Sequence, residues 1–171
     1  MYTLEDVKSN CENKNYVLDA VKEDGLLLEG ACENLRNTKE VVMRAVETDG
    51  GALEFASDNL KNDKDILMKA VETKGWVICY ASEKLKADKD IILKAVKNDG
   101  QALYYASKEL RDDDNVVLEA VKNKGLILKY ASKRLRSNKE IVKEAIKQDK
   151  RAFEFIVPEL RADEEILSLI K

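Results

Sequence analysis

The sequence predicts an all-α protein, an α-solenoid of about six tandem 25-residue repeats with two helices each. Three observations support this prediction. Glycine recurs at every twenty-fifth position, at Gly25, Gly50, Gly75, Gly100 and Gly125. Two further columns share the period, Ala20, Ala45, Ala70, Ala95, Ala120 and Ala145, and Leu35, Leu60, Leu85, Leu110, Leu135 and Leu160. The chain also has a single proline and abundant alanine, leucine, lysine and glutamate, which favour helices.

The period divides the chain into three stretches of one continuous solenoid. Residues 1–12 form a degenerate N-terminal half-unit, because Asn10 stands where the leucine column requires leucine. Residues 13–162 contain the tandem helical-hairpin repeats. Residues 163–171 are predicted to form a C-terminal capping helix, where we expect larger apolar residues to close the last layer. The alternative is that these residues begin a further repeat that lies outside this sequence.

The unit from Asp63 to Ala87 shows how the residues define the first helix of a repeat. Asp63 is the expected N-cap, since its carboxylate accepts hydrogen bonds from the free amides of the first turn. Apolar residues then follow with helical spacing, at Ile66, Leu67, Ala70 and Val71. Gly75 is expected to end the helix in the left-handed conformation, which glycine adopts without steric cost. The other repeats have a capping residue at the same position, Thr38, Asp88, Asp113, Asn138 and Asp163.

A second helix of about ten residues is predicted after the glycine. Its apolar residues in this unit are Val77, Ile78, Tyr80, Ala81 and Leu85. Lys86 follows, where a cation suits the negative end of the helix dipole. The serine column, which includes Ser82, is expected to allow close helix packing and to donate its hydroxyl to a carbonyl one turn back. Such short helices are marginal alone, so each repeat must stack on the next.

The sequence offers little chemistry. Cys11, Cys32 and Cys79 are odd in number and contain no C-x-x-C pair, which favours free thiols in an intracellular, cytoplasmic protein. Histidine, the usual general base and metal ligand, is absent. No phosphate-binding loop or nucleophile motif occurs, and residues 112–114 lack the glycine and glutamate of a calcium loop. We therefore expect no enzyme activity, no cofactor, no metal site and no membrane span, which needs an apolar run of about 20 residues.

One face of the second helix varies from repeat to repeat and is the candidate protein-binding stripe. Aromatic residues at its centre lie between acidic positions before them and basic positions after them, a composition typical of protein-binding surfaces. The stripe consists of Glu29, Glu54, Trp76, Cys79, Glu83, Gln101, Tyr104, Lys108, Lys129 and Lys133. The alternative is that these positions vary only because they face solvent, with Trp76 covering a gap beside Gly51 or Gly75.

The charge distribution supplies a second hypothesis. Residues 1–85 carry 17 acidic and 11 basic side chains, whereas residues 86–171 carry 16 acidic and 19 basic ones. Clustered cations bind nucleic acid or an anionic surface by releasing counterions. The candidate anion-binding patch consists of Lys122, Lys124, Lys129, Lys133, Arg134 and Arg136. The alternative is that this lysine-rich face is only solvated. A third interpretation is a structural spacer of a larger protein, and the leading one is a non-catalytic scaffold for an unknown protein partner.

The repeated string itself resembles a known family. The segments AVETKGWVICYASEKLKAD at 70–88 and AVKNKGLILKYASKRLRSN at 120–138 share the pattern A-V-x-x-x-G-x-x-[LI]-x-[YF]-A-S-x-x-L-[KR]-x-[DN]. This pattern is similar to that of the short helical repeats called domain of unknown function 4116, from about Asn13 to Asp163. The resemblance implies helical repeats and implies no activity, cofactor or catalytic residue. Residues 1–12 and the turn at Ile156, Val157 and Pro158 depart from the pattern.

Overall fold

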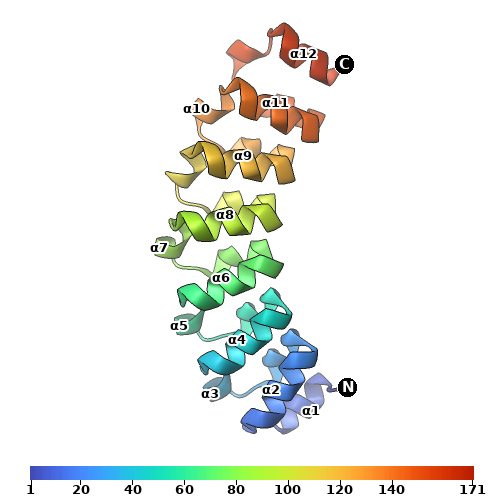
Figure 1. Ribbon diagram of the computed structural model, residues 1–171, viewed down its shortest axis with the longest axis vertical. Helices are drawn as coiled ribbons and strands as arrows, with labels where there is room; N and C mark the ends of the chain where they lie inside the picture. Colours follow the sequence, from blue (N-terminus) through green and yellow to red (C-terminus); the bar gives the residue numbers. More distant parts are fainter. The chain divides into compact units, whose positions relative to one another are not determined.

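The computed structural model describes all 171 residues and contains helices but no β-strand, which confirms the predicted all-α repeat architecture. The chain forms two compact units, Met1–Leu85 and Lys86–Lys171. In each unit a long α-helix, a six-residue 3-10 helix and a short helical turn recur with the 25-residue period (Figure 1). None of the helices combines the length and the apolar character that a membrane span requires.

Unit 1 begins with α1 (Leu4–Ser9) and continues with repeats in which α4 packs between α2 and α6. Its long helices are α2 (Lys14–Glu23), α4 (Lys39–Thr48) and α6 (Lys64–Thr73). Its 3-10 helices are η1 (Gly25–Gly30), η2 (Gly50–Phe55) and η3 (Gly75–Tyr80). The short helices are α3 (Glu33–Arg36), α5 (Asp58–Lys61) and, at the boundary between the units, α7 (Glu83–Lys86).

Unit 2 repeats the plan, with α9 between α8 and α11. Its long helices are α8 (Lys89–Asn98), α9 (Asp114–Asn123), α11 (Lys139–Gln148) and the shorter α12 (Glu164–Ile170). Its six-residue 3-10 helices are η4 (Gly100–Tyr105), η6 (Gly125–Tyr130) and η7 (Lys150–Phe155). The short elements are η5 (Leu110–Asp112), α10 (Lys133–Arg136) and η8 (Pro158–Leu160).

The long helices begin at the predicted caps. The Asp63 carboxylate accepts hydrogen bonds from the amides of Asp65 and Ile66, at 3.0 and 3.2 Å. The same two-amide cap recurs at Asp88, Asp113, Asn138 and Asp163. Thr38 occupies the cap position of α4 but does not cap it, because its hydroxyl donates to the carbonyl of Asn34 at 2.8 Å. Five of the six predicted caps are therefore confirmed by their hydrogen bonds.

The prediction that glycine ends the long helix in a left-handed conformation is wrong, since no residue of the chain has a positive φ. Gly50 instead starts η2, where its backbone lies against the next long helix. A Cβ on Gly50 would lie 2.1 Å from the Ala70 carbonyl oxygen. At Gly125 the equivalent distance, to the Ala145 carbonyl, is 2.2 Å. The glycine column is thus explained by close packing between successive repeats within a unit.

The second predicted helix is also different from the expectation. The structure replaces one helix of about ten residues by a six-residue 3-10 helix and a four-residue α-helix, as in η2 and α5. Extended backbone at Ala56 and Ser57 separates the two, with ψ values of 157° and 156°. Apolar residues in so short a segment fit the i, i+3 spacing of a 3-10 helix as well as that of an α-helix.

The serine column begins the short helices, and the predicted bond to a carbonyl one turn back is wrong. Ser57 accepts from the Leu60 amide at 3.4 Å and donates its hydroxyl to Asn37 Oδ1 at 2.7 Å. The Ser57 amide also donates to the carbonyl of Arg36, in the preceding repeat, at 3.0 Å. Both backbone and side chain of this column therefore join adjacent repeats.

Apolar packing between repeats supplies the core. The long helices bury their branched face, as at Ile66, Leu67 and Val71 in α6. The 3-10 helices add fully buried residues such as Leu53 and Leu103, and no polar or charged residue is buried. Burying one such side chain contributes about 1.5–3 kcal/mol, so stacking rather than helix propensity holds these short elements.

Ion pairs connect the first turns of successive long helices. The first residue of α4, Lys39, contacts the next cap, Asp63, at 2.7 Å and Asp65 at 3.1 Å. In unit 2, Lys139 contacts Asp163 at 2.8 Å, and this hydrogen bond holds the pKa of Asp163 below its ordinary value. We refer to these pairs as the lysine–aspartate ladder.

The cysteines differ from the prediction of three free thiols. Cys11 and Cys32 are joined by a disulfide across 21 residues, and the Cys32 amide donates to the Cys11 carbonyl at 3.1 Å. Cys32 occupies the serine column, where α3 begins without a side-chain cap. The bond attaches the α1–α2 connection to the first full repeat, and only Cys79 remains outside a disulfide.

Candidate functional site

The candidate protein-binding stripe lies mainly on the six-residue 3-10 helices. Residues i and i+3 of a 3-10 helix share one edge, so Trp76 and Cys79 of η3, and Gln101 and Tyr104 of η4, form pairs on the same edge. Each repeat also has a stripe position seven residues after the first one, and in this repeat that residue, Glu83, lies on the separate short helix α7. Every stripe residue is exposed except Cys79, which is half-buried.

In unit 1 the stripe combines acidic side chains with one tryptophan. Glu29 and Glu54 are exposed and form no ion pair within the unit. Trp76 is 39% exposed, and its ring lies 5.9 Å from that of Tyr80 in an edge-on arrangement. The ammonium of Lys61 lies 5.4 Å from the centre of the Tyr80 ring, within the range of a cation–π interaction.

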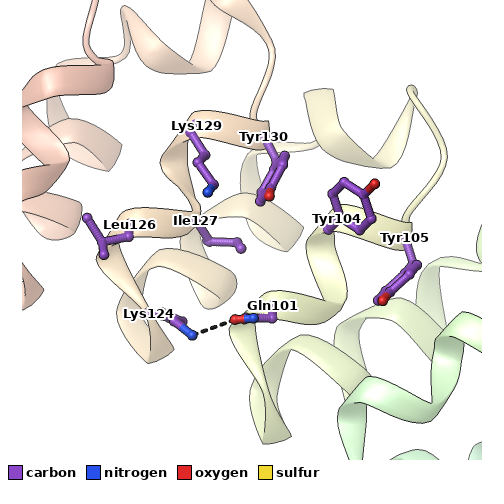
Figure 2. Close-up of a pocket in the computed structure, with 8 residues that line it drawn as sticks. All are labelled: Gln101, Tyr104, Tyr105, Lys124, Leu126, Ile127, Lys129 and Tyr130. Atoms are coloured by element: carbon purple, nitrogen blue, oxygen red, sulfur yellow. Dashed lines mark hydrogen bonds between the residues drawn. The ribbon is translucent and has the colours of Figure 1, made fainter.

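In unit 2 the stripe opens into an aromatic cavity. Tyr104 is 53% exposed, the most exposed aromatic side chain, and its ring packs against Tyr130 at 4.8 Å and Tyr105 at 5.0 Å. The cavity between η4 and η6 has a volume of about 310 Å³. Figure 2 shows its lining, Gln101, Tyr104, Tyr105, Lys124, Leu126, Ile127, Lys129 and Tyr130. The cavity thus brings Gln101, Tyr104 and Lys129 of the stripe together.

The stripe lysines of unit 2 lack the ion pairs that lysines of the long helices form. Lys122 of α9 contacts Glu119 at 3.1 Å, and Lys89 of α8 contacts Asp113 at 2.6 Å. The stripe residues Lys108, Lys129 and Lys133 form no ion pair, so their charge is exposed without compensation.

The candidate anion-binding patch is spread over α9, η6 and α10. Arg134 is neutralised by Asp112 at 2.9 Å and Asp114 at 2.8 Å. The hydrogen bond from the Ser132 hydroxyl, followed by that from Arg134, holds the pKa of Asp112 below its ordinary range. The hydrogen bond from Arg134 does the same for the pKa of Asp114. Arg136 is half-buried, and its Nη1 donates to the Phe155 carbonyl at 3.4 Å. The structure therefore does not form one continuous cationic surface from these residues.

The acidic cluster at residues 112–114 has structural contacts. Asp113 caps α9 and pairs with Lys89, whereas Asp112 and Asp114 hold Arg134. No group of three or more histidine, cysteine, aspartate or glutamate side chains is arranged to hold a metal ion.

Comparison with known families agrees with the repeat geometry. The family described as Domain of unknown function (DUF4116) matches in six overlapping windows, residues 13–61, 38–86, 63–111, 88–136, 113–161 and 138–168. The chain belongs to this family. Successive windows start 25 residues apart, the same period as the DUF4116 repeats of the structure. No curated protein and no solved structure was found to match the chain.

The sequence predicts Gln101, Tyr104 and Lys129 in the stripe and Lys124 in the anion-binding patch, and Leu126 also falls on a variable stripe position. The sequence analysis does not single out Tyr105, Ile127 or Tyr130. Tyr105 and Tyr130 belong to a column of the DUF4116 repeat that is aromatic in most repeats, Phe55, Tyr80, Tyr105, Tyr130 and Phe155. Leu126 and Ile127 follow the glycine that starts η6. The aromatic column was a usable signal, since Tyr104 stands beside it in the one repeat with two adjacent tyrosines.

Proposed function

We propose that the chain is a non-catalytic repeat module that binds another protein through the exposed edge of its 3-10 helices. The observation that carries this proposal is the exposure of Trp76 and Tyr104 at variable positions on otherwise well-packed helices. Large aromatic side chains are enriched among the residues that dominate protein-binding energies. Repeat proteins generally bind through such surfaces, formed by corresponding positions of successive repeats.

The backbone beneath Tyr104 is held in place before any partner binds. Asp99 caps η4 by accepting from the Gln101 amide at 2.9 Å, and Gly100 donates to Asn123 of the next long helix at 2.8 Å. A surface that is already ordered loses little conformational entropy on binding. This supports a role for the exposed edge as a fixed recognition surface.

Affinity capture from a lysate of the source or host, with and without nuclease, tests the proposal. The wild-type chain is compared with the Trp76→Ala/Tyr104→Ala variant and with a matched control, Asn59→Ala/Asn115→Ala, which alters exposed residues outside the stripe. We expect a protein retained by wild type and control after nuclease treatment, and reduced at least tenfold in the aromatic variant, since each lost anchor costs about 1–2 kcal/mol or more.

Circular dichroism of all three proteins establishes that helicity is unchanged. Equal capture by the wild type and the aromatic variant would remove the stripe as the binding surface. Capture that disappears with nuclease would instead favour nucleic-acid binding.

A further inference from the structure

We propose that the cavity between η4 and η6 binds an acidic segment of a partner protein and receives one apolar side chain of that segment. This inference rests on the proposed protein-binding function and specifies the chemistry of the partner. It depends on the shape of the cavity, on the charge of its rim and on the packing of its aromatic rings, all within unit 2.

The cavity has a suitable size and lining for one aliphatic or aromatic side chain. Its volume is about 310 Å³, and its walls include Leu126, Ile127 and the three tyrosines (Figure 2). The tyrosine rings are packed edge to face, with interplanar angles of 63° and 79°. Because they support one another, the cavity exists without a partner and an inserted side chain meets ordered walls.

The rim of the cavity is positive. Neither aspartate nor glutamate lines it, whereas Lys124 and Lys129 both do. Lys124 donates to Gln101 Oε1 at 2.6 Å, a neutral acceptor that leaves the charge of the ammonium uncompensated. Lys129 lies 4.8 Å from the centre of the Tyr130 ring and forms no ion pair. Carboxylates placed on either side of an inserted apolar residue would supply the missing partners and accelerate association.

The same geometry favours a peptide over single-stranded nucleic acid. Binding of bases requires free ring faces on which successive bases stack. Here Lys129 lies over the Tyr130 ring, and Tyr104 packs against both neighbouring rings. A nucleic acid also needs a series of cations along its phosphates, but the guanidinium of Arg134 is already held by two aspartates.

The test is a selection from a phage-displayed library of random 12-residue peptides on the full chain. Enriched peptides are then labelled and titrated by fluorescence anisotropy, beside a labelled 12-nucleotide uridine RNA. We expect enriched peptides in which several acidic residues flank one aliphatic or aromatic residue. Replacing that residue by glycine, or the acids by lysines, should weaken binding at least tenfold.

Variants of the chain localise the site. Lys129→Glu and Tyr130→Ala should each weaken peptide binding at least tenfold. Because Lys129 is exposed, Lys129→Glu is expected to fold normally and still tests the site if Tyr130→Ala fails to fold. Lys147→Glu is the matched control, since Lys147 of α11 is an exposed lysine outside the cavity, the stripe and the candidate anion-binding patch, and should leave the affinity within about twofold. Raising the salt concentration should weaken binding of the acidic peptide, because salt screens the attraction between its carboxylates and the lysines of the rim.

Three results would overturn the inference: no enriched peptide, enrichment without acidic residues, or binding of the RNA that Lys129→Glu abolishes. Retention of a protein in the capture experiment, without acidic peptides in the selection, would leave the proposed function standing and reject only this partner chemistry. The reverse result would support the cavity and reject the wider stripe.

Discussion

The glycine column provides the sharpest test of how the repeats are held together. Gly50→Ala places a Cβ 2.1 Å from the Ala70 carbonyl oxygen and 2.6 Å from Thr73 Oγ1. Ordinary contacts of a Cβ begin near 3.4 Å, so η2 and α6 must move apart by roughly 1 Å, which rigid cores resist. The Thr73 hydroxyl also accepts from the Gly50 amide at 2.8 Å, and that hydrogen bond is lost on separation.

The two effects give the expected magnitude. Overpacking of a close contact costs about 1–3 kcal/mol, and the lost hydrogen bond costs about 1 kcal/mol. We therefore expect Gly50→Ala to lower the free energy of unfolding by about 2–4 kcal/mol. With a urea dependence of about 2 kcal/mol per molar, the midpoint should fall by about 1–2 M.

The neighbouring glycine is the control. A Cβ on Gly51 lies 3.0 Å from Asp49 Oδ1 and 3.5 Å from Leu26 Cδ2, both at the ends of side chains. Gly51→Ala should change the free energy of unfolding by less than about 1 kcal/mol, because a small clash offsets the reduced entropy of the unfolded chain. Urea unfolding followed by circular dichroism at 222 nm compares the two variants. If Gly50→Ala were as stable as Gly51→Ala, close approach to the Ala70 carbonyl would not explain the column.

Two further predictions concern charge and redox state. The hydrogen bond from Lys139 lowers the pKa of Asp163, so at low pH the unfolded chain binds more protons than the folded chain. The free energy of unfolding should therefore be constant near neutrality and decrease as the pH falls below about 4. Lys139→Met should flatten this decrease in urea titrations between pH 7 and pH 3, and an unchanged pH dependence in the variant would contradict the prediction. The Cys11–Cys32 disulfide closes a loop across 21 residues, so reduction should lower the free energy of unfolding by about 2–4 kcal/mol. Alkylation of the unfolded chain followed by mass spectrometry should modify one thiol before reduction and three after it, and three modified thiols before reduction would refute the pairing.

The parts of the fold that depend on neighbouring residues could be predicted from the sequence. The caps of the long helices were predictable because the Asp63 carboxylate bonds amides only two and three residues away. The 25-residue period required only counting, and the apolar face of α6 followed from helical spacing.

What the sequence could not show depends on atoms one repeat away. A glycine that ends a helix and a glycine that packs against the Ala70 carbonyl give the same pattern within one repeat. The 3-10 helices escaped prediction because six residues are too few to distinguish two helical periods. The cavity was missed in part because Tyr130 reaches Tyr104 from the following repeat.

The sequence contains one signal of these contacts between repeats. Most long helices start with lysine, but α9 starts with Asp114, which would repel an aspartate at the next cap. That cap is Asn138, and Arg134 binds Asp114 instead. Aspartate in place of lysine at position 114 is thus accompanied by a neutral cap at position 138 and by an arginine at position 134. These linked differences indicate which positions of successive repeats pair in the lysine–aspartate ladder.

The nearly constant sequence separation between the partners of these contacts has a consequence for how the number of repeats can change. The Gly50 amide bonds a side chain 23 residues later, Ser57 bonds a carbonyl 21 residues earlier, and Lys39 pairs 24 residues ahead. An in-frame duplication or deletion of 25 residues moves donors and acceptors by one whole period, so these three kinds of donor again face the corresponding positions of a neighbouring repeat. A shift of even one residue separates all of them at once. Recombination can therefore lengthen or shorten this protein in whole periods while the exposed edge of each new copy remains free to diverge.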